Sequence, residues 1–291
     1  MSNYVVTTDT SADLPEQYYR EHQMTVMSLS CILDGETYAR GAKELSTAEF
    51  YAKMREGKMP TTSQVNPEQA KQIFEPLIKE GKDILHIAFS SGLSGTCGSA
   101  RIAAEDLMEE YPERKIIVID SLCASLGQGL LVHKTLEKQK EGLTLEELAA
   151  WCEEMKMHII HSFTVDDLFH LYRGGRVSKA AAVIGTMIQL KPVLHVNNEG
   201  KLIPLSKVRS RKKSLQALVA AMETRQGSFA DKNDIVFISH GDCEEDAEYV
   251  KTLVEEKFGI HKFIISPVGN VIGAHSGPGT LALFFLGDNR E

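Results

Sequence analysis

The stretch ILHIAFSSGLSGTCGSARIAAEDLM, residues 84–108, decides the fold class of this chain. It begins with an apolar run, Ile84 to Phe89, which is typical of a buried strand. A turn rich in serine and glycine follows, and a helical pattern spans Ala100 to Met108. A buried strand joined to a helix by a short polar turn is the repeating unit of a parallel α/β sheet.

The turn itself, Phe89 to Thr96, suits an anionic group. Backbone N–H groups at the start of a helix lie at the positive end of the helix dipole, where a carboxylate or a phosphate binds. A capped turn with a purely structural role explains the same residues equally well. Three further polar turns, at residues 9–11, 61–64 and 120–121, follow predicted strands or precede predicted helices. Since ligands of open α/β sheets bind at the carboxyl ends of strands, these turns could converge on one cleft.

Strands and helices alternate outward from this stretch through the first half of the chain. Two helix starts carry capping boxes, Asn66 with Gln69 and Thr144 with Glu147. Alternation of this kind predicts a parallel sheet with right-handed crossovers. The predicted strands are residues 4–8, 24–33, 84–89, 115–120 and 157–164, and the predicted helices begin at residues 47, 67, 100, 130 and 145.

The pattern changes near Thr164, where we place a domain boundary. Residues 191–196 and 202–208 flank the turn signal Asn197-Asn198-Glu199-Gly200 and predict a hairpin. A basic helix, a buried strand, an acidic helix and two more strands follow. We therefore expect an α/β protein with a parallel-sheet N-terminal domain, residues 1–163, and a mixed α/β C-terminal domain, residues 164–291.

Composition excludes several classes of protein. The net charge of −8 argues against a nucleic-acid binder, although residues 161–220 hold ten Lys/Arg and three Asp/Glu, a local charge of +7. Such a segment indicates an anionic partner, or else simply a solvated basic surface. The five scattered cysteines form no C-x-x-C pair, which predicts neither a disulfide framework nor a zinc ribbon. With no signal peptide and no apolar run of about 18 residues, we expect a cytoplasmic protein.

His275 lies among three glycines in residues 273–279 and is a candidate for binding an anion or moving a proton. Ser94 and His275, with Asp9 or Asp120, could also form a hydrolase triad. The nucleophile elbow requires G-x-S-x-G, however, and Thr96 stands where its last glycine belongs. P-loop and dinucleotide-binding motifs are absent, and no histidine spacing predicts a metal site.

The segment Ser178–Leu190 is apolar and rich in alanine and glycine. It is either a tightly packed core helix or a wall whose small side chains leave room for a long apolar ligand. For such a ligand, burial at about 0.8 kcal/mol per CH₂ would dominate affinity.

Several ordered motifs resemble one family across nearly the whole chain. They are residues 8–15 (TDTSADLP), 62–64 (TSQ), 90–96 (SSGLSGT), 118–121 (VIDS), 171–176 (LYRGGR), 190–192 (LKP), 207–209 (KVR) and 275–279 (HSGPG). Together they are similar to the DegV family of bacterial fatty-acid-binding proteins, which includes the FakB-type subunits of fatty acid kinase. Proline often follows the TSQ motif in that family, and Val65 stands there in this chain.

The resemblance implies a DegV-like (EDD) fold that buries one long-chain fatty acid, such as palmitate, with its carboxylate at the interdomain cleft. Carried over by motif, Thr62 and Ser94 would hydrogen-bond the carboxylate, His275 would support them, and Arg173 would lie near the head group. The protein would be a carrier without catalysis of its own, needing no metal or other cofactor.

In the kinase-partner members, a separate ATP-dependent subunit phosphorylates the bound acid. The resemblance places Arg209 and Arg211 at the docking surface for that partner. The alternative remains a serine hydrolase acting on acyl esters through Ser94 and His275. The preferred chain length and the oligomeric state do not follow from the sequence.

Overall fold

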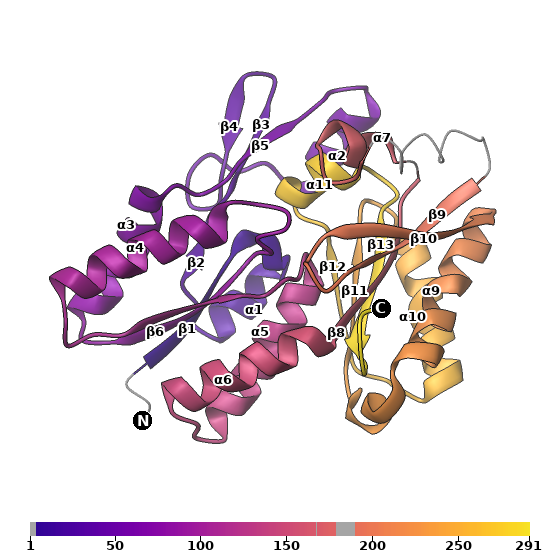
Figure 1. Ribbon diagram of the computed structural model, residues 1–291. Coiled ribbons are helices and arrows are strands. Elements are labelled where there is room, and N and C mark those ends of the chain that lie inside the picture. The colour runs from indigo at the N-terminus through magenta and orange to yellow at the C-terminus, as the bar shows by residue number, and fades with distance from the viewer. Residues whose placement is uncertain (1–3, 167, 179–189) are drawn as a thin grey trace.

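The computed structural model describes residues 4–166, 168–178 and 190–291 (Figure 1). Its first sheet is parallel and has four strands in the order β2-β1-β6-β7. Apolar runs with β-branched residues form these strands, as expected for a sheet that is covered on both faces. They are β1 (Tyr4–Asp9), β2 (Val26–Met27), β6 (Asp83–Ala88) and β7 (Ile116–Asp120).

Helices cover both faces of this sheet. Successive residues of a strand point to opposite faces, so each strand has side chains in both helical layers. In β6, Ile84 packs in the apolar layer of α3 and α4, whereas Leu85 packs in the layer of α5 and α6. Both predicted capping boxes are present, at the starts of α3 and α6. The helices are α1 (Glu16–Glu21), α3 (Pro67–Lys79), α4 (Thr96–Glu110), α5 (Leu126–Lys140) and α6 (Leu145–Met155).

The second sheet is mixed and has six strands in the order β10-β9-β8-β13-β11-β12. Helices α9 (Arg211–Arg225) and α10 (Glu244–Phe258) cover its outer face, and α5 packs on its inner face. Helix α5 thus lies between the two large sheets (Figure 1). The strands are β8 (Ile159–Thr164), β9 (Leu190–Val196), β10 (Leu202–Arg209), β11 (Val236–His240), β12 (Phe263–Pro267) and β13 (Leu281–Leu286).

A small antiparallel sheet in the order β4-β3-β5 completes the described fold. Its apolar face joins a cluster with α2 and with Ala274 of α11, so a late helix packs against an early sheet. Helix α7 contacts α11 on the same side of the molecule. The elements are β3 (Ser30–Leu33), β4 (Glu36–Tyr38), β5 (Thr61–Ser63), α2 (Thr47–Arg55), α7 (Phe169–Arg173), α11 (Asn270–Ser276) and the 3₁₀ turns Thr10–Ala12, Lys156–His158 and Gly227–Lys232.

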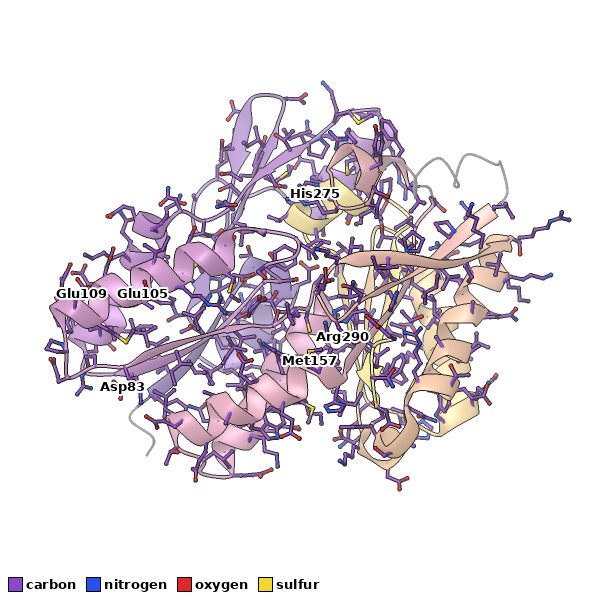
Figure 2. All side chains as sticks on the ribbon, viewed as in Figure 1. Asp83, Glu105, Glu109, Met157, His275 and Arg290 are labelled. Carbon is purple, nitrogen blue, oxygen red and sulfur yellow. The ribbon has the colours of Figure 1, made fainter. Side chains whose placement is uncertain are left out.

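Arg290 forms hydrogen bonds to segments from both halves of the molecule (Figure 2). Its side chain is fully buried and donates to the carbonyl oxygens of Leu122 (2.5 Å) and Asn197 (3.3 Å), and to that of Lys156. These carbonyls belong to the turn after β7, the β9–β10 hairpin and the turn before β8. A single guanidinium with no carboxylate partner among the described residues therefore holds three separate segments.

The α/β fold, with a parallel N-terminal sheet and a mixed C-terminal sheet, is confirmed. Two strand predictions need correction. Residues 24–33 do not form one strand, because the backbone N–H of Leu29 donates to Thr10 Oγ1 and separates β2 from β3. Strand β8, which we placed at the end of the first domain, pairs with β9 and β13, so the second sheet begins at Ile159 rather than after residue 163.

The five cysteines are free thiols. Within the described ranges, no helix is long and apolar enough to cross a membrane.

Candidate fatty-acid site

A cavity of about 320 Å³ is lined by both halves of the chain. Its polar lining residues are Thr62, Ser63, Gln64, Ser94, Ser125, His161, Arg176, Ser239, His275, Ser276 and Thr280. Its apolar lining residues are Leu29, Phe89, Leu93, Ala124, Phe163, Leu171, Val196, Leu202, Val268, Val271, Ile272, Ala282 and Phe284. The cavity thus brings together three of the predicted site residues, Thr62, Ser94 and His275.

Two carboxylates, those of Asp9 and Asp120, accept hydrogen bonds from backbone N–H groups of the serine-rich turn after β6. Asp9 accepts hydrogen bonds from the backbone N–H groups of Phe89 (2.7 Å) and Ser11 (2.9 Å). Asp120 accepts from Ser91 (3.1 Å) and Leu122 (3.2 Å). Burial raises the pKa of Asp9 to about 6, although the hydrogen bonds oppose that shift. Both acids therefore shape the turn.

Ser94 lines the cavity at the end of this turn, and its Oγ already accepts a hydrogen bond. Its Oγ accepts from the backbone N–H of Thr96 (3.2 Å) and lies 3.0 Å from Thr96 Oγ1. A side chain at Gly92 would place its Cβ 2.6 Å from the carbonyl oxygen of Glu199, so the turn packs directly on the β9–β10 hairpin. The close approach explains why glycine stands at this position.

His275 projects from α11 and meets Thr62 of β5, at the side of the molecule where the small sheet lies (Figure 2). Its Nε2 is 2.7 Å from Thr62 Oγ1, and its Nδ1 is buried without a hydrogen-bond partner. Burial, with smaller effects from the charges of Arg176 and Arg173, lowers the pKa of His275 to about 4. The imidazole is consequently neutral at pH 7, with a single N–H to donate.

Two arginines lie close to this histidine, and they differ in position. Arg173 donates from Nη2 to the carbonyl oxygens of Pro60 (2.9 Å), the residue before β5, and Ala274 (3.0 Å) of α11, and it does not line the cavity. Arg176 does line the cavity and donates to the carbonyl oxygen of Leu93. The sequence analysis singled out Arg173 and not Arg176 of the same motif, because spacing alone does not tell which guanidinium faces the cavity.

The residues considered for a hydrolase triad do not assemble into one. The hydrogen bonds of Ser94 go to Thr96, whereas that of His275 goes to Thr62. Asp9 and Asp120 are engaged with backbone amides, as described above. Among the described residues, no group of three metal-ligating side chains comes together.

A protein-family model described as "Uncharacterised protein, DegV family" matches residues 3–288. The chain belongs to the DegV family. It is 44% identical over 293 residues to a DegV domain-containing protein of Clostridium perfringens, with all of both chains covered. The family resemblance inferred from the motifs is therefore confirmed.

Solved structures of similar proteins share the fold. DegV of Bacillus subtilis, a fatty acid binding protein, is 32% identical with a TM-score of 0.83, covering 99% of this chain and 100% of that one. A stearic acid-binding protein from Eubacterium ventriosum is 26% identical with a TM-score of 0.87, covering 98% of each chain.

The remaining predicted residues of this DegV chain, Arg209 and Arg211, lie in different surroundings. Arg209 ends strand β10 and is exposed. Arg211, at the start of α9, is engaged within the chain, since its Nε lies 2.8 Å from Asp246 Oδ2. Of the small-residue segment predicted as a cavity wall, residues 179–189 lie outside the described residues. The apolar run 281–286 is strand β13, which contributes Ala282 and Phe284 to the wall.

Proposed function

We propose that this protein binds one long-chain fatty acid, with the carboxylate beside Thr62 and Ser94 and the tail among the apolar side chains of the cavity. The fatty acid binding protein of Bacillus subtilis and the stearic acid-binding protein of Eubacterium ventriosum support this assignment, because each aligns with nearly the whole chain. The cavity lining supports it as well, since polar donors and apolar carbons share one cavity.

One observation carries the assignment of the head-group end. The two hydroxyls on the cavity wall, those of Thr62 and Ser94, each have a neighbour that can donate a hydrogen bond to the oxygen. His275 is the neighbour of Thr62, and Thr96 is the neighbour of Ser94. When His275 carries its proton on Nε2, it donates to Thr62 Oγ1, and Thr96 donates to Ser94 Oγ. The hydroxyl protons of Thr62 and Ser94 are then free to donate to a carboxylate.

The two ends of the ligand would contribute differently to binding. At about 0.8 kcal/mol per buried CH₂, a C16 tail gains on the order of 10 kcal/mol before the cost of ordering it. Each hydrogen bond to the carboxylate contributes about 1.5–3 kcal/mol. The tail therefore dominates affinity, and the two hydroxyls select for an acid over an uncharged lipid.

Native mass spectrometry of the purified protein tests this proposal. We expect an added mass of one long-chain fatty acid, which is lost when the protein is denatured. Delipidated protein should reload with palmitate or oleate. Methyl palmitate, which has the same tail and no carboxylate, is the matched control and should load much less. A bare protein mass that stays bare after incubation with either acid would refute the proposal.

We further propose that the loaded protein presents its ligand to a separate ATP-dependent kinase subunit, which transfers the γ-phosphoryl group of ATP to the carboxylate. The carrier itself would supply no catalytic group, in keeping with the separate hydrogen bonds of Ser94 and His275. Exposed Arg209 lies in the basic segment 161–220 and would dock an acidic face of the kinase.

Arg209→Ala tests the docking role in a coupled assay with a purified kinase subunit. We expect unchanged lipid content and slower acyl-phosphate formation. Lys201→Ala is the control, because Lys201 is also exposed, lies in the same hairpin and is paired with Glu199. Equal rates for Arg209→Ala and the wild type would remove Arg209 from the docking surface. A fluorophosphonate probe that labels Ser94 covalently would revive the hydrolase alternative.

A further inference from the structure

A second polar cluster, Asp13, Ser125 and Ser239, meets the cavity from elements other than those of the proposed head-group site. We call it the inner polar cluster. Ser125 and Ser239 line the cavity, and Asp13 lies behind them. The three side chains are 7%, 5% and 0% exposed. In the second sheet, Ser239 pairs directly with Ala282, which belongs to the apolar wall.

Ser125 has an unusual backbone conformation for a residue with a side chain. Ser125 has φ 53° and ψ −145°, close to a region that is almost exclusive to glycine. Asp13 also has a positive φ, 50°. Residues hold such strained conformations only where the surroundings enforce them, and this combination is typical of functional sites.

The hydrogen bonds of the cluster leave one oxygen with unused capacity. Ser125 Oγ lies 2.6 Å from Asp13 Oδ2 and 3.0 Å from Ser239 Oγ. Ser125 has a single proton, and an ionised Asp13 takes it, so Ser239 must donate to Ser125. The lone pairs of Ser239 Oγ then remain as an acceptor on the cavity wall.

Protonation of Asp13 reverses this chain of donors. A protonated Asp13 donates to Ser125, Ser125 donates to Ser239, and the Ser239 hydroxyl can then donate into the cavity. Burial raises the pKa of Asp13 to about 7, so both forms occur near neutral pH. A ligand group that both donates and accepts fits the two states equally, and an alcohol hydroxyl is such a group.

We infer that the cavity accepts a long-chain fatty acid bearing a hydroxyl group along its chain, and that Ser239 receives this hydroxyl. The inference rests on the proposed fatty-acid binding and names a substrate class for the same cavity. An unsubstituted chain leaves the remaining hydrogen-bonding capacity of Ser239 unused, whereas a hydroxyl in an entirely apolar cavity would be buried without a partner. Placing the ligand hydroxyl at Ser239 gives it that partner.

A panel of stearates hydroxylated at successive carbons, with unsubstituted stearate as reference, tests the inference by displacement of a fluorescent fatty acid. In the wild type, at least one isomer should bind within about threefold of stearate. Ser239→Ala should weaken that isomer by about 5- to 50-fold relative to stearate, the range expected for stranding a buried polar group. Comparing the ratio between variants cancels the difference in solubility between the two acids.

Ser162→Ala is the matched control, because Ser162 is equally buried in the same sheet and does not line the cavity. It should leave the ratio unchanged. If Ser239→Ala also leaves the ratio unchanged for every isomer, or if every isomer binds the wild type far more weakly than stearate, the inference is wrong. If stearate itself fails to bind, the proposed fatty-acid binding fails instead.

Discussion

Thr62→Val gives the sharpest test of how the head group would be held. Valine has nearly the shape of threonine and lacks the hydroxyl, so the substitution removes a hydrogen bond and leaves no void. In the wild type, Thr62 Oγ1 lies 2.7 Å from His275 Nε2 on one side and lines the cavity on the other. The variant therefore removes the last link of a chain that runs from His275 to the proposed carboxylate.

Two losses follow from the structure. A hydrogen bond to a carboxylate contributes about 1.5–3 kcal/mol, which corresponds to fatty-acid binding roughly 10- to 150-fold weaker. In the ligand-free protein, His275 loses the partner of Nε2 while its Nδ1 already has none. Leaving a buried polar group unpaired costs about 1–3 kcal/mol, and since Thr62 is partly exposed we expect the lower end in the free energy of unfolding.

Displacement of a fluorescent fatty acid from delipidated protein measures the first loss, and urea unfolding measures the second. Thr61→Val is the matched control, because Thr61 is the exposed neighbour on the same strand and does not line the cavity. If Thr62→Val binds palmitate within twofold of both the wild type and Thr61→Val, the proposed chain from His275 to the carboxylate is wrong.

Four further predictions follow from the same geometry. Ser94→Ala should weaken palmitate binding about tenfold in the same displacement assay and leave urea unfolding nearly unchanged; a fully retained affinity would contradict the head-group assignment. Ser125→Gly should be more stable than Ser125→Ala by about 1–2 kcal/mol in urea unfolding, because glycine relieves the strained backbone, and equal stabilities would show that there is no strain. NMR titration should find the pKa of His275 near 4 without ligand and higher in loaded protein, because a carboxylate favours the imidazolium; a fall on loading would contradict the site. Since an unfolded histidine titrates near 6.5, the contribution of His275 to stability should be lost as the pH falls from about 6.5 toward 4, and a His275→Asn variant should lack that loss.

Local signals in the sequence gave much of the secondary structure correctly. Both capping boxes and the β9–β10 hairpin depend on residues a few positions apart, so they can be predicted from short stretches of sequence. The pairing of β8 could not be read in this way. Its six residues are all buried, and a strand without a polar, exposed face contains nothing that tells which sheet it joins.

The same division holds for the site. The motifs named Thr62, Ser94 and His275, and the structure brings all three to one cavity. The motifs did not tell Arg176 from Arg173, nor did they mark Ser239 or Asp13 as neighbours of Ser125. Those contacts join residues that lie far apart in the sequence, and they depend on where α7, α11 and β11 pack in the fold.

The sequence by itself determined the fold class, through short runs of residues with their own turn, capping and burial chemistry, and its motifs gave the family and the proposed head-group residues Thr62 and Ser94 by resemblance. The tertiary structure alone decided which strands share a sheet, which arginine faces the cavity and which hydroxyls are backed by a donor. The physical reason is that hydrogen bonds and burial depend on distance in space, and the packing of α5 between two sheets brings together residues that no local pattern connects.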